Sequence, residues 1–458
     1  MQQNGNDKQT RGEASLAPSE KLFVEQLTQR LRQEEREQGH LIAAISYKRS
    51  LVERFGIETA FQIARQHLRV PDLDVLIPRN VVSLKDAARR SGFVHELWAG
   101  GRPFVHSLPR VRGEGDHLEQ HGISRSGYLT CLEDVLVRGR SAVVMKENEA
   151  IVDFETDELQ RFADSPEQEP GVLYAAESVY WTMDPRDPPE IIDEAFMLSG
   201  CHANDFGHWL QEYLPKLAIA LLAGLPDVPI LVDERIPRTH LQSIELFCPG
   251  STMIVIPHLA PRRVRRLWCA SNPTYRGWYP SDWTSAWEGM VTDPQNFATT
   301  INKLTDLASN AIQVPTGFDR VFLGRRPTKK KKLVNHRQIE AVAEAKGFRV
   351  VYPEDLSFVE QMSLARHARH IIAPDGSNGL LSYFAGHGAK VCFLNHPHTL
   401  PLAEINGLLE ALRIEFTIFT GPFFGDPNPE PYWNDYLIDE TDFERFLSEW
   451  LAENSAAD

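Results

Sequence analysis

The chain has little of what marks secreted, membrane-spanning or metal-binding proteins. No stretch approaches the roughly 20 apolar residues that span a bilayer, and residues 1–19 are polar and unlike a secretory signal. The 458 residues include only five cysteines, without C-x-x-C spacing: Cys131, Cys201, Cys248, Cys269 and Cys392. Such scattered cysteines predict free, largely buried thiols. The sequence therefore predicts a cytoplasmic protein, with peripheral association at the inner face of the membrane as a second interpretation.

Positive charge is also scarce. Lys and Arg number 48 against 63 Asp and Glu, which gives a net charge of −15 at pH 7. Because polyanions need a basic surface, nucleic acid is not an expected partner. The chain lacks a G-x-G-x-x-G fingerprint and a G-x-S-x-G elbow, which argues against NAD-dependent enzymes such as nucleotide-sugar epimerases and against α/β-hydrolases. Its length and its 42% hydrophobic content predict a globular protein of two or three domains.

Titratable side chains are concentrated in residues 201–217, at the start of an apolar stretch. Asn204 or Asp205 can cap a helix at this point. The i,i+4 spacing then places His208 and Glu212 on one face of that helix. An imidazole beside a carboxylate suits general-base catalysis, with Asp205 or the other member of the pair orienting the base. The sequence leaves open whether Glu212 or His208 takes the proton.

This segment also has a plainer interpretation. The helix would then belong only to the core, with His208 as a satisfied polar contact and Glu212 paired with Lys216 at i+4. Perturbed and paired titratable groups occur in structural networks as well as in active sites. The segment alone favours the structural interpretation, and the rest of the chain has to decide between the two.

Two patterns resemble metal sites weakly. Cys201, His202 and His208 are zinc-ligand types, but no convincing fourth ligand lies nearby in the sequence. Asp72 and Asp74 form a D-x-D triplet of the kind that holds divalent metals, and three-residue matches arise often by chance. No metal site is predicted.

A basic loop begins after a short β-prone run at residues 321–323 and precedes a helical pattern at residues 337–346. Arginine presents a planar fork that matches phosphate oxygens, so Arg325 and Arg326 at the end of a strand predict a diphosphate clamp. Four consecutive lysines follow, Lys330 among them. Such a run is usually a solvated face, and steering of an anionic ligand is the functional alternative.

Strands and helices alternate in the following segment. Strands are predicted at residues 348–352, 370–373 and 390–394, and a helix with a capping box at residues 357–368. This βαβ rhythm predicts an α/β fold with a parallel sheet and crossover helices. Ligands of such sheets bind outside the carboxyl ends of the strands.

One small-residue loop lies at such an end. Asp375, Gly376, Ser377 and Asn378 follow the predicted strand 370–373 and precede an apolar helical stretch. Backbone N–H groups of a loop like this can approach a phosphate at a helix N-terminus. An ordinary turn is an equally good interpretation.

The order of these segments resembles glycosyltransferase family 61, with its bacterial capsular-polysaccharide (DUF563-like) members. Residues 204–217 look like its Asn-(x)-Phe-Gly-His-Trp-(two residues)-acidic segment, 323–326 like its Ser-Arg-Arg element, 347–360 like its Gly-Phe to Ser-Phe-(x)-Glu run, and 373–384 stand where the family has a Gly-(x)-His-Gly-Ala-Gly-Leu-type loop. The likeness covers about residues 170–400. Its strength lies in four elements in the right order.

The resemblance implies a GT-B-like architecture, with two Rossmann-like domains facing a central cleft. It also implies a nucleotide-sugar donor, a UDP-sugar, held by the C-terminal half. A saccharide or lipid-linked saccharide would be the acceptor, and the reaction would invert the anomeric carbon without a required metal. In that reaction a base deprotonates the acceptor hydroxyl while cations and backbone dipoles stabilise the departing diphosphate.

Two departures from the family pattern qualify the implied donor site. Asp375 stands where the family often has His, and Gly324 stands where it has Ser. A carboxylate would repel a diphosphate, so Asp375 is expected to turn toward a ribose or sugar hydroxyl or to cap the next helix. The departures make a catalytically silent glycan- or nucleotide-binding module in a larger assembly the alternative function.

The chain divides into five predicted regions. They are a disordered arm (1–19), a helical extension (20–75), an acceptor-side α/β domain (76–285), a nucleotide-sugar-binding α/β domain (286–430), and a C-terminal helix (431–458) that crosses back onto the first domain. The helical extension predicts either a homodimer contact or helices packed on the first domain.

Overall fold

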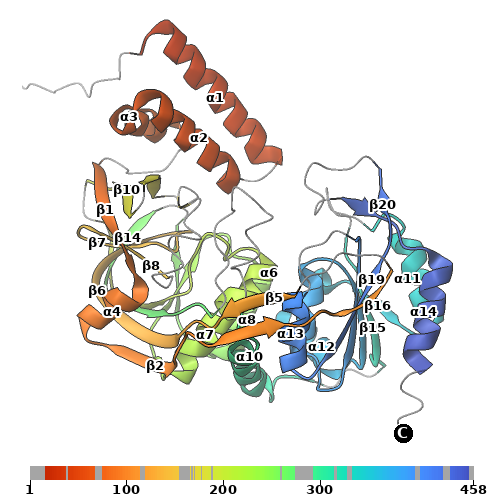
Figure 1. Cartoon of the computed structure of the whole chain (residues 1–458). Coiled ribbons are helices and arrows are strands. Elements are labelled where there is room, and N and C mark those ends of the chain that lie inside the picture. Colours follow the sequence, from red (N-terminus) through yellow and green to blue (C-terminus); the bar gives the residue numbers. More distant parts are fainter. Residues whose placement is uncertain are drawn as a thin grey trace, which may run out of the picture.

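A computed structural model describes residues 16–37, 40–67, 75–113, 119–153, 166, 169, 171–176, 178–186, 189–257, 260–273, 292–313, 317–326, 333–397, 403–425 and 434–452. The predicted arm (1–15 of it), the D-x-D triplet at 72–74 and Lys330 with its neighbouring lysines lie outside these residues. The fold is mixed α/β, as predicted, with two large sheets and helices packed on them (Figure 1).

Three N-terminal helices pack on one another and on the first sheet (Figure 1). They are α1 (Pro18–Glu37), α2 (His40–Phe55) and α3 (Ile57–His67). Their apolar cluster extends to Leu173 and Met183 of the sheet. The buried ammonium of Lys48 donates to the carbonyl oxygens of Glu169 (3.0 Å) and Val172 (2.6 Å), which ties α2 to the sheet edge. The helices therefore pack on the sheet, and the homodimer contact stays a prediction.

The first sheet has eleven strands and mixed directions. Its order is β13 (Met253–Ile256), β12 (Ile230–Asp233), β11 (Ile191–Met197), β14 (Pro261–Ala270), β6 (Gly127–Arg138), β7 (Val144–Lys146), β8 (Glu149–Val152), β1 (Val75–Ser83), β10 (Val179–Asp184) and β9 (Val172–Ala176), with β2 (Val94–Trp98) also on β6. The strands from β13 to β14 are parallel. Helices α4 (Leu84–Ser91), α7 (Leu214–Leu222) and α8 (Arg238–Phe247) accompany this sheet. The parallel strands direct their carboxyl ends to one edge.

The second sheet has six strands, and every neighbouring pair is parallel. Its order is β16 (Arg349–Val351), β15 (Arg320–Leu323), β17 (His370–Pro374), β18 (Lys390–Asn395), β19 (Glu415–Thr420) and β4 (Arg110–Arg112). The chain runs from β15 outward to β16 and then returns to β17 on the other side of β15. The strand order thus reverses between β15 and β17, which is the topological switch point of a doubly wound sheet. The predicted strands at 321–323, 370–373 and 390–394 are confirmed.

Helices connect the strands of the second sheet. They are α11 (His336–Ala345), the short 3-10 helix η3 (Pro353–Asp355), α12 (Phe358–His367), the 3-10 helix η4 (Ser377–Phe384) and α13 (Ala403–Ala411). Helix α14 (Glu440–Ala452) follows the last strand of the chain. The capping box of Ser357 and Glu360 on α12 is present as predicted. The stretch after Asp375 is helical, but as a 3-10 helix that begins at Ser377.

Two long-range features depart from the predicted layout. Strand β4 lies within the region assigned to the first domain, yet it pairs with β19 of the second sheet. Strands β3 (Pro103–His106) and β5 (Gln120–Ile123), which precede and follow β4 in the chain, pair with each other in antiparallel orientation. Strand β3 also packs against α13. A second small hairpin joins β20 (Phe423–Phe424) and β21 (Asp435–Tyr436). The N-terminal half therefore contributes a strand to the C-terminal sheet.

The C-terminal helix α14 does not cross back onto the first sheet as predicted. Its apolar face, with Phe443, Phe446 and Trp450, lies in the cluster formed by α11 and by strands β15, β17, β18 and β19. Helix α14 thereby covers apolar side chains on one face of the second sheet, which have to be buried against another element. In Figure 1, α14 lies beside α11, at the far side of the molecule from the first sheet.

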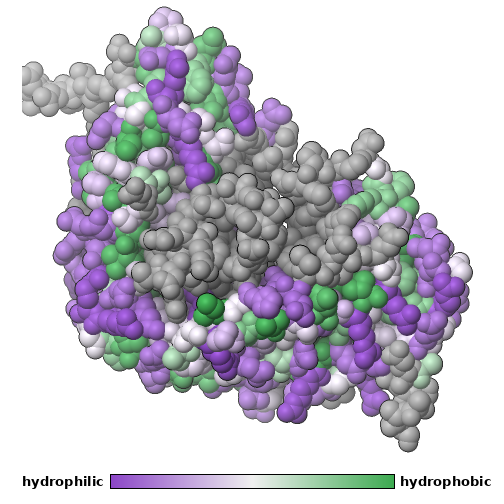
Figure 2. Space-filling view, viewed as in Figure 1, coloured by the Kyte–Doolittle hydropathy of each residue, from purple (hydrophilic) through white to green (hydrophobic). Residues whose placement is uncertain are grey.

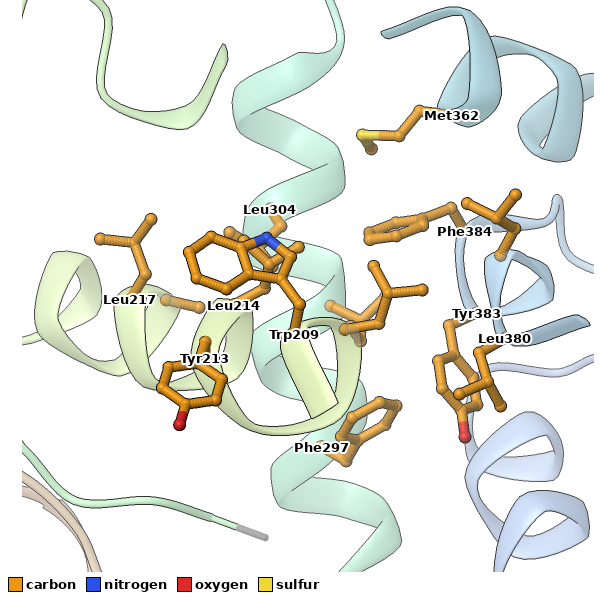
Figure 3. Close-up of a cluster of buried hydrophobic side chains, with 14 of the residues drawn as sticks. Trp209, Tyr213, Leu214, Leu217, Phe297, Leu304, Met362, Leu380, Tyr383 and Phe384 are labelled. Carbon is orange, nitrogen blue, oxygen red and sulfur yellow. The ribbon is translucent and has the colours of Figure 1, made fainter. Parts of the chain in front are cut away.

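The two halves share one hydrophobic core, in which the helix α10 (Pro294–Ala308) takes part. Figure 3 shows Trp209 of the first half beside Leu304 of α10, with Phe297 on the same helix and Tyr383 and Phe384 on η4. The ring of Phe297 meets that of Tyr383 edge-on at 4.9 Å. Packing of this kind fixes the two halves relative to each other.

The described surface offers no membrane-crossing helix, since none of the helices in the described ranges is both long and apolar enough. On the face in Figure 2, hydrophilic side chains are interspersed with hydrophobic ones over both halves of the molecule. This mixture is usual for the surface of a folded protein.

Candidate active site

The helix that follows β11 is built on one capping residue. Asp205 is its N-cap, and Asp205 Oδ1 accepts hydrogen bonds from the backbone N–H groups of Gly207 (2.8 Å) and His208 (3.3 Å). The helix continues from α6 (Phe206–His208) through a π turn, η2 (Trp209–Tyr213), into α7. π turns are rare and are frequent at functional sites. Of the two predicted caps, Asp205 is therefore the one used, and both of these bonds go to the backbone.

His208 and Glu212 form a direct pair, as their spacing predicted. His208 Nδ1 lies 2.5 Å from Glu212 Oε1. The imidazole is 27% exposed and the carboxylate 9% exposed. When Nδ1–H donates to the carboxylate, Nε2 is left as the basic nitrogen of the ring. Glu212 does not pair with Lys216, so the structural interpretation is wrong about its partner.

Glu212 also contacts a residue that the sequence analysis missed. Asn272 Nδ2 donates to Glu212 Oε2 at 3.4 Å. Asn272 follows β14, the parallel neighbour of β11 in the sheet. No motif marks this asparagine, and its place just after the apolar run 267–270 is the one signal that the sequence offers.

A second imidazole covers the first. The rings of His202 and His208 stack at 4.3 Å with 14° between their planes. Burial, then the nearby His208 and Arg140, hold the pKa of His202 well below its usual value, so His202 is neutral. Burial likewise raises the pKa of Cys201 well above the usual range and keeps it a thiol. The described part of the chain contains no group of three or more His, Cys, Asp or Glu side chains suited to a metal ion, so the zinc alternative has no support there.

Arg325 lies at the switch point of the second sheet. It follows β15, and its guanidinium donates from Nη1 to the carbonyl oxygen of Asp375, which follows β17, at 2.6 Å. The guanidinium lies directly over Gly376, where an added Cβ would be 2.9 Å from Nη1. Only glycine allows this approach without displacing the arginine. The predicted basic group and the predicted glycine loop are therefore in contact.

Arg326 turns away from Arg325. Its guanidinium forms two hydrogen bonds of 2.7 Å with the Asp355 carboxylate and lies 5.2 Å from the centre of the Tyr352 ring. The side chain is 59% exposed. The two arginines therefore do not form one fork, because the loop after β15 directs alternate side chains to opposite sides.

Gly324 and Asn378 complete this edge. The Tyr352 ring packs on Gly324, where a Cβ would meet Cε1 at 2.8 Å, and Asn378 Nδ2 donates to the Gly324 carbonyl oxygen at 3.2 Å. A serine at position 324 would clash with that ring.

Asp375 is buried, and it does not cap the next helix. The N-cap of η4 is Gly376, without a side-chain cap bond. The Asp375 carboxylate lies close enough to Tyr436 to raise the pKa of that phenol further, after burial, which is the larger cause. The capping alternative is therefore wrong, and an orientation toward a ligand hydroxyl stays a prediction.

The two sheet edges meet where the helix after β11 begins. Gly207 packs against Ser377 and Leu380, and a Cβ on Gly207 would lie 3.4 Å from the Ser377 Cβ. One turn further, Gln211 Nε2 donates to the Tyr383 hydroxyl at 2.7 Å in the core. The helix that carries His208 and Glu212 therefore packs directly on the segment that begins with the loop of residues 375–379.

Comparison with known families agrees with this geometry. A family model described as Glycosyltransferase 61 matches residues 206–392. The matched segment begins at the helix that carries His208 and Glu212, and it includes Arg325 and the loop after β17. No curated protein gives a significant match.

Proposed function

We propose that this glycosyltransferase moves a sugar from a nucleotide-sugar donor to a saccharide or lipid-linked saccharide acceptor, by a single displacement that inverts the anomeric carbon and needs no metal ion. The glycosyltransferase activity itself rests on the matched family domain at residues 206–392. The observation that carries the rest is that the helix bearing the His–Glu pair packs, through Gly207, on Ser377 beside the arginine–glycine switch point. Each supplies one of the two functions that the displacement requires.

The donor diphosphate binds at the switch point in this proposal. Open parallel sheets bind ligands outside the carboxyl ends of the strands where the strand order reverses. Arg325 supplies the cation there, and the backbone of Gly376 and Ser377 at the start of η4 supplies N–H groups. These groups stabilise the negative charge that develops on the departing diphosphate. We propose a GT-B-like architecture on this basis, supported by the two α/β sheets, and the family resemblance implies that the donor is a UDP-sugar.

His208 is the better candidate for the base. Its ring is about three times as exposed as Glu212, whose two oxygens already have partners in His208 and Asn272. Glu212 then holds the ring in the tautomer whose Nε2 can accept the acceptor proton, and it stabilises the imidazolium that forms. Asp205 acts by capping the helix, which fixes where His208 lies.

The cellular role follows from the resemblance alone. We propose that the enzyme acts in the biosynthesis of a polysaccharide or glycoconjugate of the capsular type, at the cytoplasmic face of the membrane, where lipid-linked acceptors are accessible. The shape of the complex with bound substrates determines which acceptor and which sugar the enzyme selects.

The direct test is transfer from a panel of nucleotide sugars to saccharide acceptors, with NMR of the new glycosidic bond. The proposal expects inversion of configuration, full activity in excess chelator, and loss of transfer in His208→Ala. Retention of configuration, or loss of activity in chelator that added divalent metal restores, would contradict the mechanism. Transfer unaffected by His208→Ala and by Glu212→Gln would contradict the assignment of the site.

A further inference from the structure

We infer that Asn272 is a positioning residue for the proposed transfer: it fixes the second oxygen of Glu212, and a buried Arg125–Asp153 pair in turn fixes Asn272. The inference rests on the proposed function, because it concerns the geometry of the His208–Glu212 pair. Its side-chain amide contacts Glu212, and it acts through the orientation of that carboxylate.

The topology brings Asn272 to this point. Strands β11 and β14 are parallel and hydrogen-bonded from Ile191–Arg263 to Phe196–Trp268. Their carboxyl ends therefore lie at the same edge of the sheet. Glu212 is on the helix that follows β11, and Asn272 is in the segment that follows β14. Neighbouring parallel strands commonly contribute different residues to one site in this way.

Two contacts hold the Glu212 carboxylate. Oε1 lies 2.5 Å from His208 Nδ1, and Oε2 accepts from Asn272 Nδ2 at 3.4 Å. With one contact alone the carboxylate could rotate about its last side-chain bond, and the orientation of the imidazole would follow. A buried carboxylate oxygen without a donor also carries a desolvation cost of about 1–3 kcal/mol. The second contact removes both problems.

The main chain of Asn272 is clamped on both sides. Its N–H donates to Asp153 Oδ2 at 2.6 Å, and its carbonyl oxygen accepts from Arg125 Nη1. Arg125 Nη2 also donates to the Asp153 carbonyl oxygen at 3.1 Å and lies 3.4 Å from Asp153 Oδ1. The three residues thus form a closed ring of hydrogen bonds.

The burial of this ring indicates how firmly it is held. The side chains of Arg125 and Asp153 are 5% and 16% exposed. Burial removes water that would otherwise compete for the hydrogen bonds of this pair. Asp153 accepts from the backbone N–H of Asn272, and Arg125 donates to its carbonyl oxygen. These bonds fix the backbone from which the side-chain amide of Asn272 extends to Glu212.

The test is the pH dependence of kcat/KM in Asn272→Ala and Asn272→Asp. Loss of the amide should lower kcat by about ten- to one-hundredfold, because small misplacements of catalytic groups have costs of this order, while the donor KM stays unchanged. Asn272→Asp places a second carboxylate against Glu212. Added negative charge favours the protonated form of the His208–Glu212 pair, so the acid limb of the profile should move to higher pH by about one unit or more.

Asn148→Ala and Asn148→Asp are the matched controls, because Asn148 is an exposed asparagine in the turn between β7 and β8. Their kinetics should equal those of the wild type. If Asn272→Ala does not fold, the profile of Asn272→Asp, which has nearly the same shape as wild type, decides alone. The inference would be overturned if the folded Asn272 variants had the wild-type pH profile and kcat and Glu212→Gln was inactive. Full activity of Glu212→Gln would instead overturn the proposed function.

Discussion

The carboxyl edges of the two sheets use different kinds of groups. At the first edge, charged and polar side chains bond to one another: His208 to Glu212, and Glu212 to Asn272. At the second edge, an arginine lies against a glycine and bonds to a backbone carbonyl. Proton transfer needs one side chain held in one orientation, whereas a diphosphate is bound well by a cation and several backbone N–H groups. The first edge therefore suits proton transfer, and the second suits binding of the diphosphate in the same reaction.

The same comparison separates the two adjacent arginines. In the sequence Arg325 and Arg326 are equivalent members of a basic loop. In the structure Arg325 is at the switch point, and Arg326 is in a surface pair with Asp355. Exposed pairs of this kind contribute little to stability or affinity. Position relative to the strand ends, and not charge alone, therefore separates the arginine that we propose to bind the diphosphate from the surface one.

Removing the carboxylate at the first edge should have the largest effect. Glu212→Gln keeps the size of the side chain but not its charge, so it no longer selects the reactive tautomer of His208 or stabilises the imidazolium. We expect kcat to fall by about 10²–10⁴-fold, with donor affinity unchanged. Stopped transfer assays beside calorimetric donor titrations measure both quantities. A comparable loss of donor affinity would mean that the first edge also binds the donor.

Breaking the second edge should weaken donor binding instead. Arg325→Ala removes charged hydrogen bonds of about 1.5–3 kcal/mol, which is roughly ten- to one-hundredfold in the dissociation constant of UDP measured by calorimetry. Arg326→Ala is the matched control, one residue away and of equal charge, and should change that constant less than about threefold. Equal effects of the two substitutions would show that general charge, not the switch point, attracts the donor.

Loosening the contact between the halves should give the smallest effect. Tyr383→Phe removes the hydroxyl that accepts from Gln211 in the core and leaves that amide without this partner. We expect the free energy of unfolding to fall by about 1–3 kcal/mol in urea titrations. Tyr352→Phe removes a part-buried hydroxyl bonded to Glu340 and should cost less. An equal or greater cost at Tyr352 would mean that the contact between the halves contributes little.

Local patterns predicted much of this structure. The i,i+4 spacing of His208 and Glu212, the capping box at Ser357 and the alternating strands of the second sheet all depend on interactions within a few residues. The α/β class follows from them, because βαβ units can form a parallel sheet in few ways. The start of the helix capped by Asp205 was correctly placed for the same reason.

Long-range packing decided what the sequence did not predict. The pairing of β4 with β19 joins segments about three hundred residues apart, and no local pattern encodes it. The place of α14 on the second sheet and the direction of Arg326 depend on partners from other elements. Asn272 carries no motif, and only the alignment of β11 with β14 brings it to Glu212.

A crystal structure with bound UDP would show directly whether the two edges form one site, as we propose. We expect the diphosphate beside Arg325 and the start of η4, on the side where Gly207 meets Ser377, so that an acceptor hydroxyl between donor and helix would reach His208. A diphosphate bound away from the ends of β15 and β17, with Arg325 still bonded only to Asp375, would contradict it.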